Sequence, residues 1–144
     1  MIGVRWVTTV LRIQVGPFRF RARLEEERSP QTCRAFLAVL PFRSRLIQAR
    51  WSGESAWVPL GDYSIGVGPE NPIHAPQPGE ILFYPAGISE TEILFPYGET
   101  RFASKFGPLA GNHFLTIIDG AEQLPELGAL VLRDGAQEIV FELD

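Results

Sequence analysis

The stretch Phe18-Arg-Phe-Arg-Ala-Arg-Leu-Glu25, followed by Ser29-Pro-Gln-Thr-Cys-Arg-Ala-Phe-Leu-Ala-Val-Leu40, decides the fold. In its first half apolar and charged residues alternate with a period of two, which predicts a strand with one buried face. In its second half Ser29 can cap a helix, and Pro30 suits the first helical position. The apolar residues of a helix over 30–40 then share one face, which is expected to pack on the core: Cys33, Phe36, Leu37 and Leu40.

Outside this stretch the chain predicts short strands separated by turns. Apolar residues of one parity over 7–15 predict a strand that pairs with 18–24 across the turn Gly16-Pro17. Further strands are expected at Leu46–Trp51, Ala56–Leu60, Glu80–Tyr84, Thr91–Phe95, Arg101–Phe106, Asn112–Ile118 and Gln137–Leu143, and a short helix at Ala121–Leu127. About nine strands with two short helices predict a mostly β fold, a closed barrel, because closure removes edge strands.

Length and composition favour a single domain over residues 1–144, with 45% hydrophobic residues to form its core. The net charge of −4 argues against a nucleic-acid partner. No stretch is long enough to span a membrane, so no membrane association is expected. The one cysteine, Cys33, cannot form an internal disulfide, and Met1–Val10 lacks the features of a secretory signal. A cytoplasmic location is the expectation.

Four blocks of sequence resemble a bacterial and archaeal family known as DUF3830, which is assigned to the cyclophilin-like superfamily. They are Ala49-Arg-Trp-Ser-Gly-Glu54, Gly79-Glu-Ile-Leu-Phe-Tyr-Pro85, Gly87-Ile-Ser-Glu-Thr-Glu92 and Leu109-Ala-Gly-Asn-His-Phe114. The order of strand and helix over 18–40 also resembles the opening of cyclophilins. The resemblance spans about residues 10 to 144 and implies a cyclophilin-like barrel. It implies no activity, because none is established for the family.

The cyclophilin resemblance places Arg50 where prolyl isomerases carry their catalytic arginine, and His113 at the position of their pocket histidine. The glutamine of those enzymes has no counterpart in Trp57-Val-Pro-Leu60. Their apolar floor is reduced here to Trp57 and Phe114. These departures argue against prolyl isomerisation, and fold alone never settles function.

The residues themselves suggest a binding site. Arg50 offers a fixed cation for an anion, or else points outward with Glu54 as a salt-bridge partner. His113 can act as an acid or base near neutral pH, or can be a structural histidine. Trp57 would supply an apolar wall, and Glu70 in the glycine- and proline-rich segment 61–79 could close over a pocket or simply form a turn.

Three functions follow as hypotheses, and whether the chain is an enzyme stays open. The first is the binding of a small polar or anionic metabolite in a groove near Arg50 and His113, capped by the loop 62–78. The second is weak peptidyl-prolyl isomerase activity. The third is an assembly role without a ligand, with a homo-oligomer contact around Leu94-Phe-Pro-Tyr97. Two histidines without metal-ligand spacing predict no metal site, and no motif predicts a cofactor.

Overall fold

The computed structural model describes residues 8–144, which form the following strands and helices. The strands are β1 (Val10–Val15), β2 (Phe18–Leu24), β3 (Phe42–Gln48), β4 (Gly53–Gly61), β5 (Pro72–Ile73), β6 (Glu80–Tyr84), β7 (Thr91–Thr100), β8 (Ala103–Ser104), β9 (Gly107–Pro108), β10 (Gly111–Asp119) and β11 (Gln137–Leu143). The α-helices are α1 (Pro30–Leu37) and α2 (Leu124–Asp134), and the 3-10 helices are η1 (Arg50–Ser52) and η2 (Ala121–Gln123).

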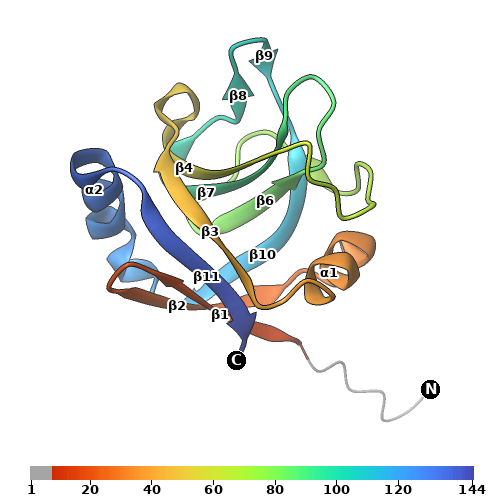
Figure 1. Ribbon diagram of the computed structural model, residues 1–144, viewed down its shortest axis with the longest axis horizontal. Helices are drawn as coiled ribbons and strands as arrows, with labels where there is room; N and C mark the ends of the chain where they lie inside the picture. Colours follow the sequence, from red (N-terminus) through yellow and green to blue (C-terminus); the bar gives the residue numbers. More distant parts are fainter. Residues whose placement is uncertain (1–7) are drawn as a thin grey trace.

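Eight antiparallel strands close into a barrel in the order β2-β1-β11-β3-β4-β7-β6-β10, because β10 pairs back with β2 (Figure 1). The predicted mostly β, closed barrel with two helices is therefore confirmed. Val7, expected at the start of the first strand, and most of the segment Met1–Val10 lie outside the described residues. No α-helix among residues 8–144 combines the length and the apolar character that crossing a membrane requires.

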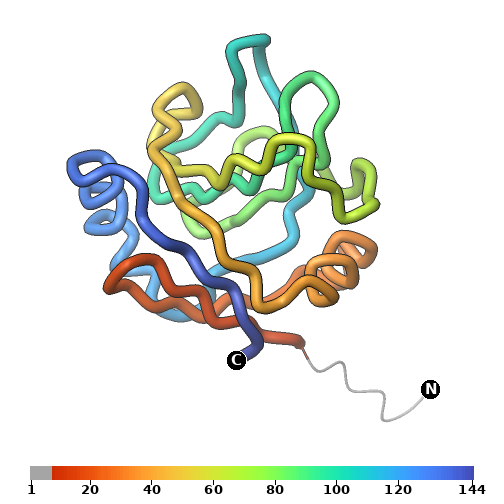
Figure 2. Tube along the Cα trace, viewed as in Figure 1, coloured from red at the N-terminus to blue at the C-terminus, as the bar shows by residue number. Residues whose placement is uncertain are grey.

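The period of two in β1 and β2 is the reason that they form this hairpin. Along β2 every second residue is buried, while Arg19, Arg21 and Arg23 are exposed. The last strand, β11, lies between β1 and β3, so the first and last strands of the chain run side by side (Figure 2). On this outer face exposed charges pair across the strands, as Arg12 does with Glu142 at 3.4 Å.

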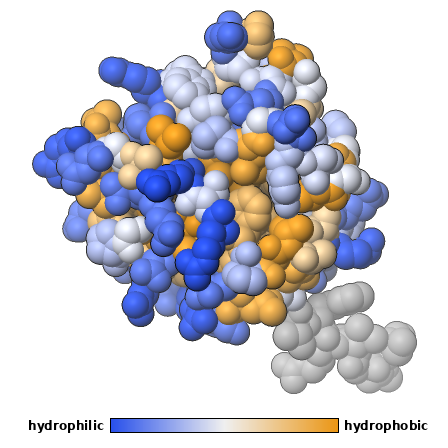
Figure 3. Space-filling view, in the orientation of Figure 1, coloured by the Kyte–Doolittle hydropathy of each residue, from blue (hydrophilic) through white to orange (hydrophobic). Residues whose placement is uncertain are grey.

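Helix α1 closes one end of the barrel through an aromatic cluster. The ring of Phe36, fully buried, packs edge-on against Phe114 at 5.1 Å and Phe141 at 5.2 Å between centroids. Phe42, at the start of β3, lies 5.4 Å from the same ring. Edge-to-face pairs of this kind add to the stabilisation that burial supplies. Hydrophobic side chains on the front surface gather toward α1 and the start of β3 (Figure 3), where Phe42 is half-buried.

A second apolar cluster covers the outside of the barrel on β6 and β7. It contains Leu82, Tyr84, Leu94, Phe102 and Leu109, with Trp57 and Ile73 packed against it. Phe102 and Leu109 flank the small β8–β9 hairpin, which folds this segment over the outer face. The strands β6 and β7 are thus buried on both faces, so their sequences are nearly continuous apolar runs.

The structure corrects several sequence-based predictions. The predicted strand Leu46–Trp51 begins earlier, as β3, and its last two residues form the 3-10 helix η1. Only Ala103 and Ser104 of the predicted strand 101–106 pair, and the helix expected over 121–127 extends as α2 to Asp134. The stretch Leu94–Tyr97, expected as an exposed oligomer contact, is the middle of β7, and its first three residues are buried. The central position of β7 between β4 and β6 explains this burial.

Replacing Phe36 by alanine should lower the free energy of unfolding by about 3–5 kcal/mol, because a fully buried aromatic ring leaves a cavity. Urea denaturation measures this change. Leu132→Ala in α2 is the matched control, since Leu132 is 59% exposed and should change stability by less than about 0.5 kcal/mol. Equal midpoints for both variants would show that α1 is not packed on the barrel.

Candidate functional site

A buried polar network fixes the long loop 61–79 against α1 and β10. The amide of Asn112, fully buried, donates to the carbonyl of Gly68 at 2.9 Å and to the hydroxyl of Thr32 at 3.1 Å, and its oxygen accepts from the backbone N–H of Glu70 at 2.8 Å. The carboxylate of Glu70 in turn accepts from the backbone N–H of Thr32 at 2.6 Å. Glu70, expected at the rim of a ligand pocket, thus caps the N-terminus of α1, where a negative charge is favourable.

Helix α1 is tied to β10 by two further buried bonds. The hydroxyl of Ser29, just before the helix, donates to the carbonyl of His113 at 2.8 Å. The thiol of Cys33 lies 3.5 Å from the carbonyl of Phe114. Burial raises the pKa of Cys33 to about 12, so this side chain stays a neutral thiol and offers no nucleophile near neutral pH.

His113, the histidine predicted to be functional, ends a chain of side-chain hydrogen bonds on the outside of the barrel. Its Nε2 lies 2.8 Å from the hydroxyl of Thr116, which donates its own proton to the carboxylate of Glu25. Nε2 must therefore carry a proton and donate to Thr116. The carboxylate of Glu25 also accepts a hydrogen bond from Nε of Arg23 at 3.0 Å. We call this set, His113, Thr116, Glu25 and Arg23, the relay.

The relay shifts the pKa of both its acid and its base. Burial alone would raise the pKa of Glu25, but the bond from Thr116 and the charges of His113 and Arg23 outweigh it and hold this pKa below its ordinary value. Burial lowers the pKa of His113, against the opposing effect of Glu25 and Glu80. At neutral pH the relay therefore holds a carboxylate and a neutral imidazole.

Glu25 and Arg23 also face a surface hollow between β2 and α1, which we call the β2–α1 hollow. Its volume is about 680 Å³. Leu37 gives it an apolar part above the buried Leu24 and Cys33. Arg28 and Arg34 add two cations, and Glu26 and Glu27 add two carboxylates. Among the described residues neither of these two arginines forms an ion pair. The hollow thus joins two arginines without an ion pair within residues 8–144, and two further carboxylates, to the carboxylate end of the relay.

Arg50 lies elsewhere. It is exposed in η1, between β3 and β4, and not inside a strand as the sequence suggested. Its expected partner Glu54 instead accepts the backbone N–H of Glu99 at 3.1 Å, and no ion pair joins Arg50 to Glu54. Arg50 and His113 were expected on neighbouring strands, yet β7 and β6 separate β4 from β10.

Trp57 does share the outer face with His113. The strand register places Trp57, Leu94, Leu82 and His113 in one row across β4, β7, β6 and β10. Three strand spacings, roughly 14 Å, separate the two ends of this row. Trp57 instead packs edge-on against Trp51 of η1, with ring centroids 5.3 Å apart. The predicted groove therefore divides into an Arg50–Trp57 corner and the relay.

Three residues with functional character were not among the predicted site residues. Thr116 and Glu25 belong to the relay, and only the pairing of β10 with β2 brings them together. Glu92 is a buried carboxyl group on β7, and one of its oxygens has no hydrogen-bond partner within residues 8–144. One signal was available: Glu92 shares the parity of Leu94 in a run that is otherwise apolar. Over residues 8–144 no three histidine, cysteine or carboxylate side chains cluster as metal ligands would.

Comparison with known families assigns the chain to a family. A family model described as "Protein of unknown function (DUF3830)" matches residues 11–143. The chain belongs to this family. The matched segment contains every residue of the relay and of the network that fixes the long loop. No curated protein sequence matches the chain.

Two solved structures share the fold of this DUF3830 chain. One is McbB in complex with tryptophan, with a TM-score of 0.72 and 16% identity over 93% of this chain and 44% of that one. The other is the solution structure of a hypothetical protein from Archaeoglobus fulgidus, with a TM-score of 0.62 and 21% identity over 99% of this chain and 100% of that one. The chain thus spans less than half the length of the McbB chain. At these identities the likeness concerns the fold alone.

Replacing Glu70 by alanine should destabilise the protein by about 0.5–2 kcal/mol, because the N-terminus of α1 loses its cap. Glu27→Ala is the control, since Glu27 is exposed and forms no side-chain hydrogen bond among the described residues. Thermal unfolding measures both variants. A Glu70→Ala protein as stable as Glu27→Ala would mean that the loop is not held through this carboxylate.

His113 should contribute a loss of stability as the pH drops below about 6.5, because the unfolded chain protonates this histidine more readily than the folded protein, in which its pKa is lowered. Glu25, whose pKa is also lowered, adds a loss of stability at lower pH, where the unfolded chain binds a proton at this residue before the folded protein does. Chemical denaturation at a series of pH values should show that the stability difference between the wild type and His113→Gln shrinks as the pH falls from about 7 to about 5.

Thr116→Val separates the hydrogen bond from the charges. The valine keeps the side-chain shape and removes the hydroxyl, so the pKa of Glu25 should rise, as NMR titration of its carboxyl carbon can show. An unchanged pKa of Glu25 in this variant would contradict the proposed direction of the chain of bonds.

Proposed function

We propose that this protein binds a small polar or anionic molecule in the β2–α1 hollow, where the relay reaches the surface. The observation that supports it is the carboxylate of Glu25, which lines the hollow and is connected through Thr116 to the buried His113. A ligand bound here would meet an apolar floor, two unpaired arginines and one oriented acceptor. Such a combination of apolar lining and a few placed polar groups is typical of metabolite sites.

Arg28 and Arg34 favour a ligand with an anionic group, which would have to bind beside the exposed carboxylate of Glu27. Arg23 is committed to Glu25, and Glu26 accepts the backbone N–H of Thr9 at 3.0 Å. Arg28 and Arg34 remain for the ligand, and an arginine can hold a carboxylate through two parallel N–H donors. A donor group on the same ligand would satisfy Glu25. His113 would then sense the ligand, because a change of charge at Glu25 changes the imidazole pKa.

The Arg50–Trp57 corner is the alternative place for the anion. Arg50 is exposed there beside the paired rings of Trp51 and Trp57, and Trp51 is 48% exposed. A prolyl-peptide substrate would need this same corner, with Arg50 directed into an apolar groove. Weak isomerase activity and a ligand-free assembly role thus stay as lesser alternatives, the second favoured only by exposed apolar side chains such as Ile88 and Phe106.

Benzoate tests the proposal, with benzyl alcohol as the neutral analogue. We expect benzoate, and not the alcohol, to raise the melting temperature, since a ligand of the folded state stabilises it by mass action. Arg34→Gln should weaken benzoate binding roughly tenfold, the usual effect of losing a charged hydrogen bond.

Two matched variants decide between the locations. Arg19→Gln, on an exposed strand position outside the hollow, should leave benzoate affinity unchanged. Loss of binding in Arg50→Gln with full binding in Arg34→Gln would move the site to the Arg50–Trp57 corner. Equal stabilisation by benzoate and benzyl alcohol would contradict an anion site altogether.

A further inference from the structure

The outer face of the barrel carries a buried carboxyl group that no role described so far uses. Glu92 pairs across the strands with Pro59 of β4 and Tyr84 of β6. The next row on the same face is Trp57, Leu94 and Leu82. Directly opposite side chains lie about 5 Å apart and diagonal ones about 7–8 Å, so Glu92 is surrounded by apolar and aromatic groups.

Glu92 lacks the partners that a buried carboxyl group normally has. Its residue is only 1% exposed, and its Oε2 has no hydrogen-bond partner among the described residues. Burial, and then the charge of Glu90, raise its pKa to about 8. The group is therefore neutral at pH 7, and an unpaired buried polar atom is costly unless a ligand or water satisfies it.

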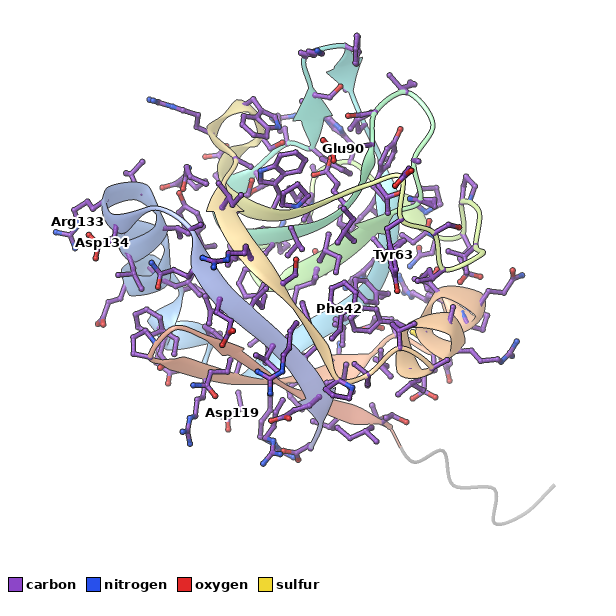
Figure 4. All side chains as sticks on the ribbon, viewed as in Figure 1. Phe42, Tyr63, Glu90, Asp119, Arg133 and Asp134 are labelled. Atoms are coloured by element: carbon purple, nitrogen blue, oxygen red, sulfur yellow. The ribbon has the colours of Figure 1, made fainter. Side chains whose placement is uncertain are left out.

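Aromatic rings and a second carboxylate lie around Glu92. Tyr84 packs edge-on against Phe102 at 5.6 Å, and Trp57 against Trp51 at 5.3 Å. Glu90, just before the start of β7 (Figure 4), accepts the backbone N–H of Gly61 at 2.8 Å and is exposed. Negative charge beside the faces of aromatic rings is the setting in which proteins hold organic cations.

The segment between β6 and β7, residues 85–90, lies next to Glu92 in the fold, and the Tyr84 hydroxyl group binds its backbone. The hydroxyl of Tyr84 accepts the backbone N–H of Ile88 at 2.9 Å and that of Ser89 at 3.4 Å. Ile88 itself is 64% exposed. Because Glu92 itself is 1% exposed, a ligand would have to enter beside this segment and displace it.

We propose that Glu92 is the anionic contact of a second ligand site, one for a small organic ammonium ion that carries an apolar or aromatic group. The ammonium N–H groups would bond to Oε2 and the rings of Trp57 and Tyr84 would contact the rest of the cation. Glu90 would add a second negative charge at the entrance. The carboxylic proton leaves for solvent as the ammonium binds, so one proton is released and the charge balances.

The test uses 2-phenylethylamine, with 2-phenylethanol as the neutral analogue of the same shape. Below pH about 8 the affinity for the amine should rise roughly tenfold for each pH unit, because Glu92 must lose its proton. Calorimetry in buffers of different ionisation enthalpy should then show release of about one proton near pH 6.5. The alcohol should bind weakly and without pH dependence.

Glu92→Gln keeps the size of the side chain and removes its charge. This variant should lose roughly tenfold or more in affinity for the amine, together with the pH dependence. Glu99→Gln, an exposed carboxylate on the same strand β7, is the control and should change neither. A melting curve establishes that each variant is folded.

Trp57→Leu gives an independent variant should Glu92→Gln fail to fold. It should lower the affinity for the amine roughly threefold or more, while the pH dependence of that affinity stays. Binding of amine and alcohol with equal affinity would overturn the proposal. So would a pH-independent affinity for the amine, a Glu92→Gln protein that binds it as the wild type does, or no binding of the amine at millimolar concentration.

Discussion

The pairing of β10 with β2 is the contact on which the rest of the structure depends. It closes the barrel and sets Leu115 opposite Leu24 and Thr116 opposite Arg23. From that register follow the bond from Thr116 to Glu25 and the position of His113 at its far end. Ser29, just before α1, donates a hydrogen bond to the same strand, and Asn112 of this strand holds the long loop. Barrel closure, helix docking and loop order therefore all depend on β10.

Two buried polar side chains, Asn112 and Glu92, differ in how fully they are hydrogen-bonded. The side-chain amide of Asn112 has a partner for its oxygen and for both N–H groups, and such a network rigidifies the segments that it joins. On the outside of β7 one oxygen of the Glu92 carboxyl group lies among apolar neighbours and has no hydrogen-bond partner in the part of the chain that the structure describes. The first arrangement explains why a loop rich in glycine and proline is ordered. The second leaves a buried oxygen without a hydrogen bond, so a ligand that donates one to it gains binding free energy.

The alternation in 18–24 and the helical spacing after Ser29 sufficed to predict β2 and α1, because local periodicity determined both elements. Arg50 was misplaced because a strand and a short 3-10 turn leave similar patterns over three residues. The partners of His113 could not be predicted, since Glu25 lies 88 positions before it in the chain and only the sheet order brings them together. Glu70 looked like a loop residue because its partner Thr32 belongs to a distant helix.

The position of Cys33 gives the protein a reporter of its own motions. It is the only cysteine of the chain, 1% exposed, at the face of α1 that meets Phe114. A thiol reagent can reach it only when the helix lifts from the barrel or the whole domain opens. The rate of its modification, followed against denaturant, would therefore measure how often that end of the barrel opens under native conditions. No label or added residue is needed for that experiment.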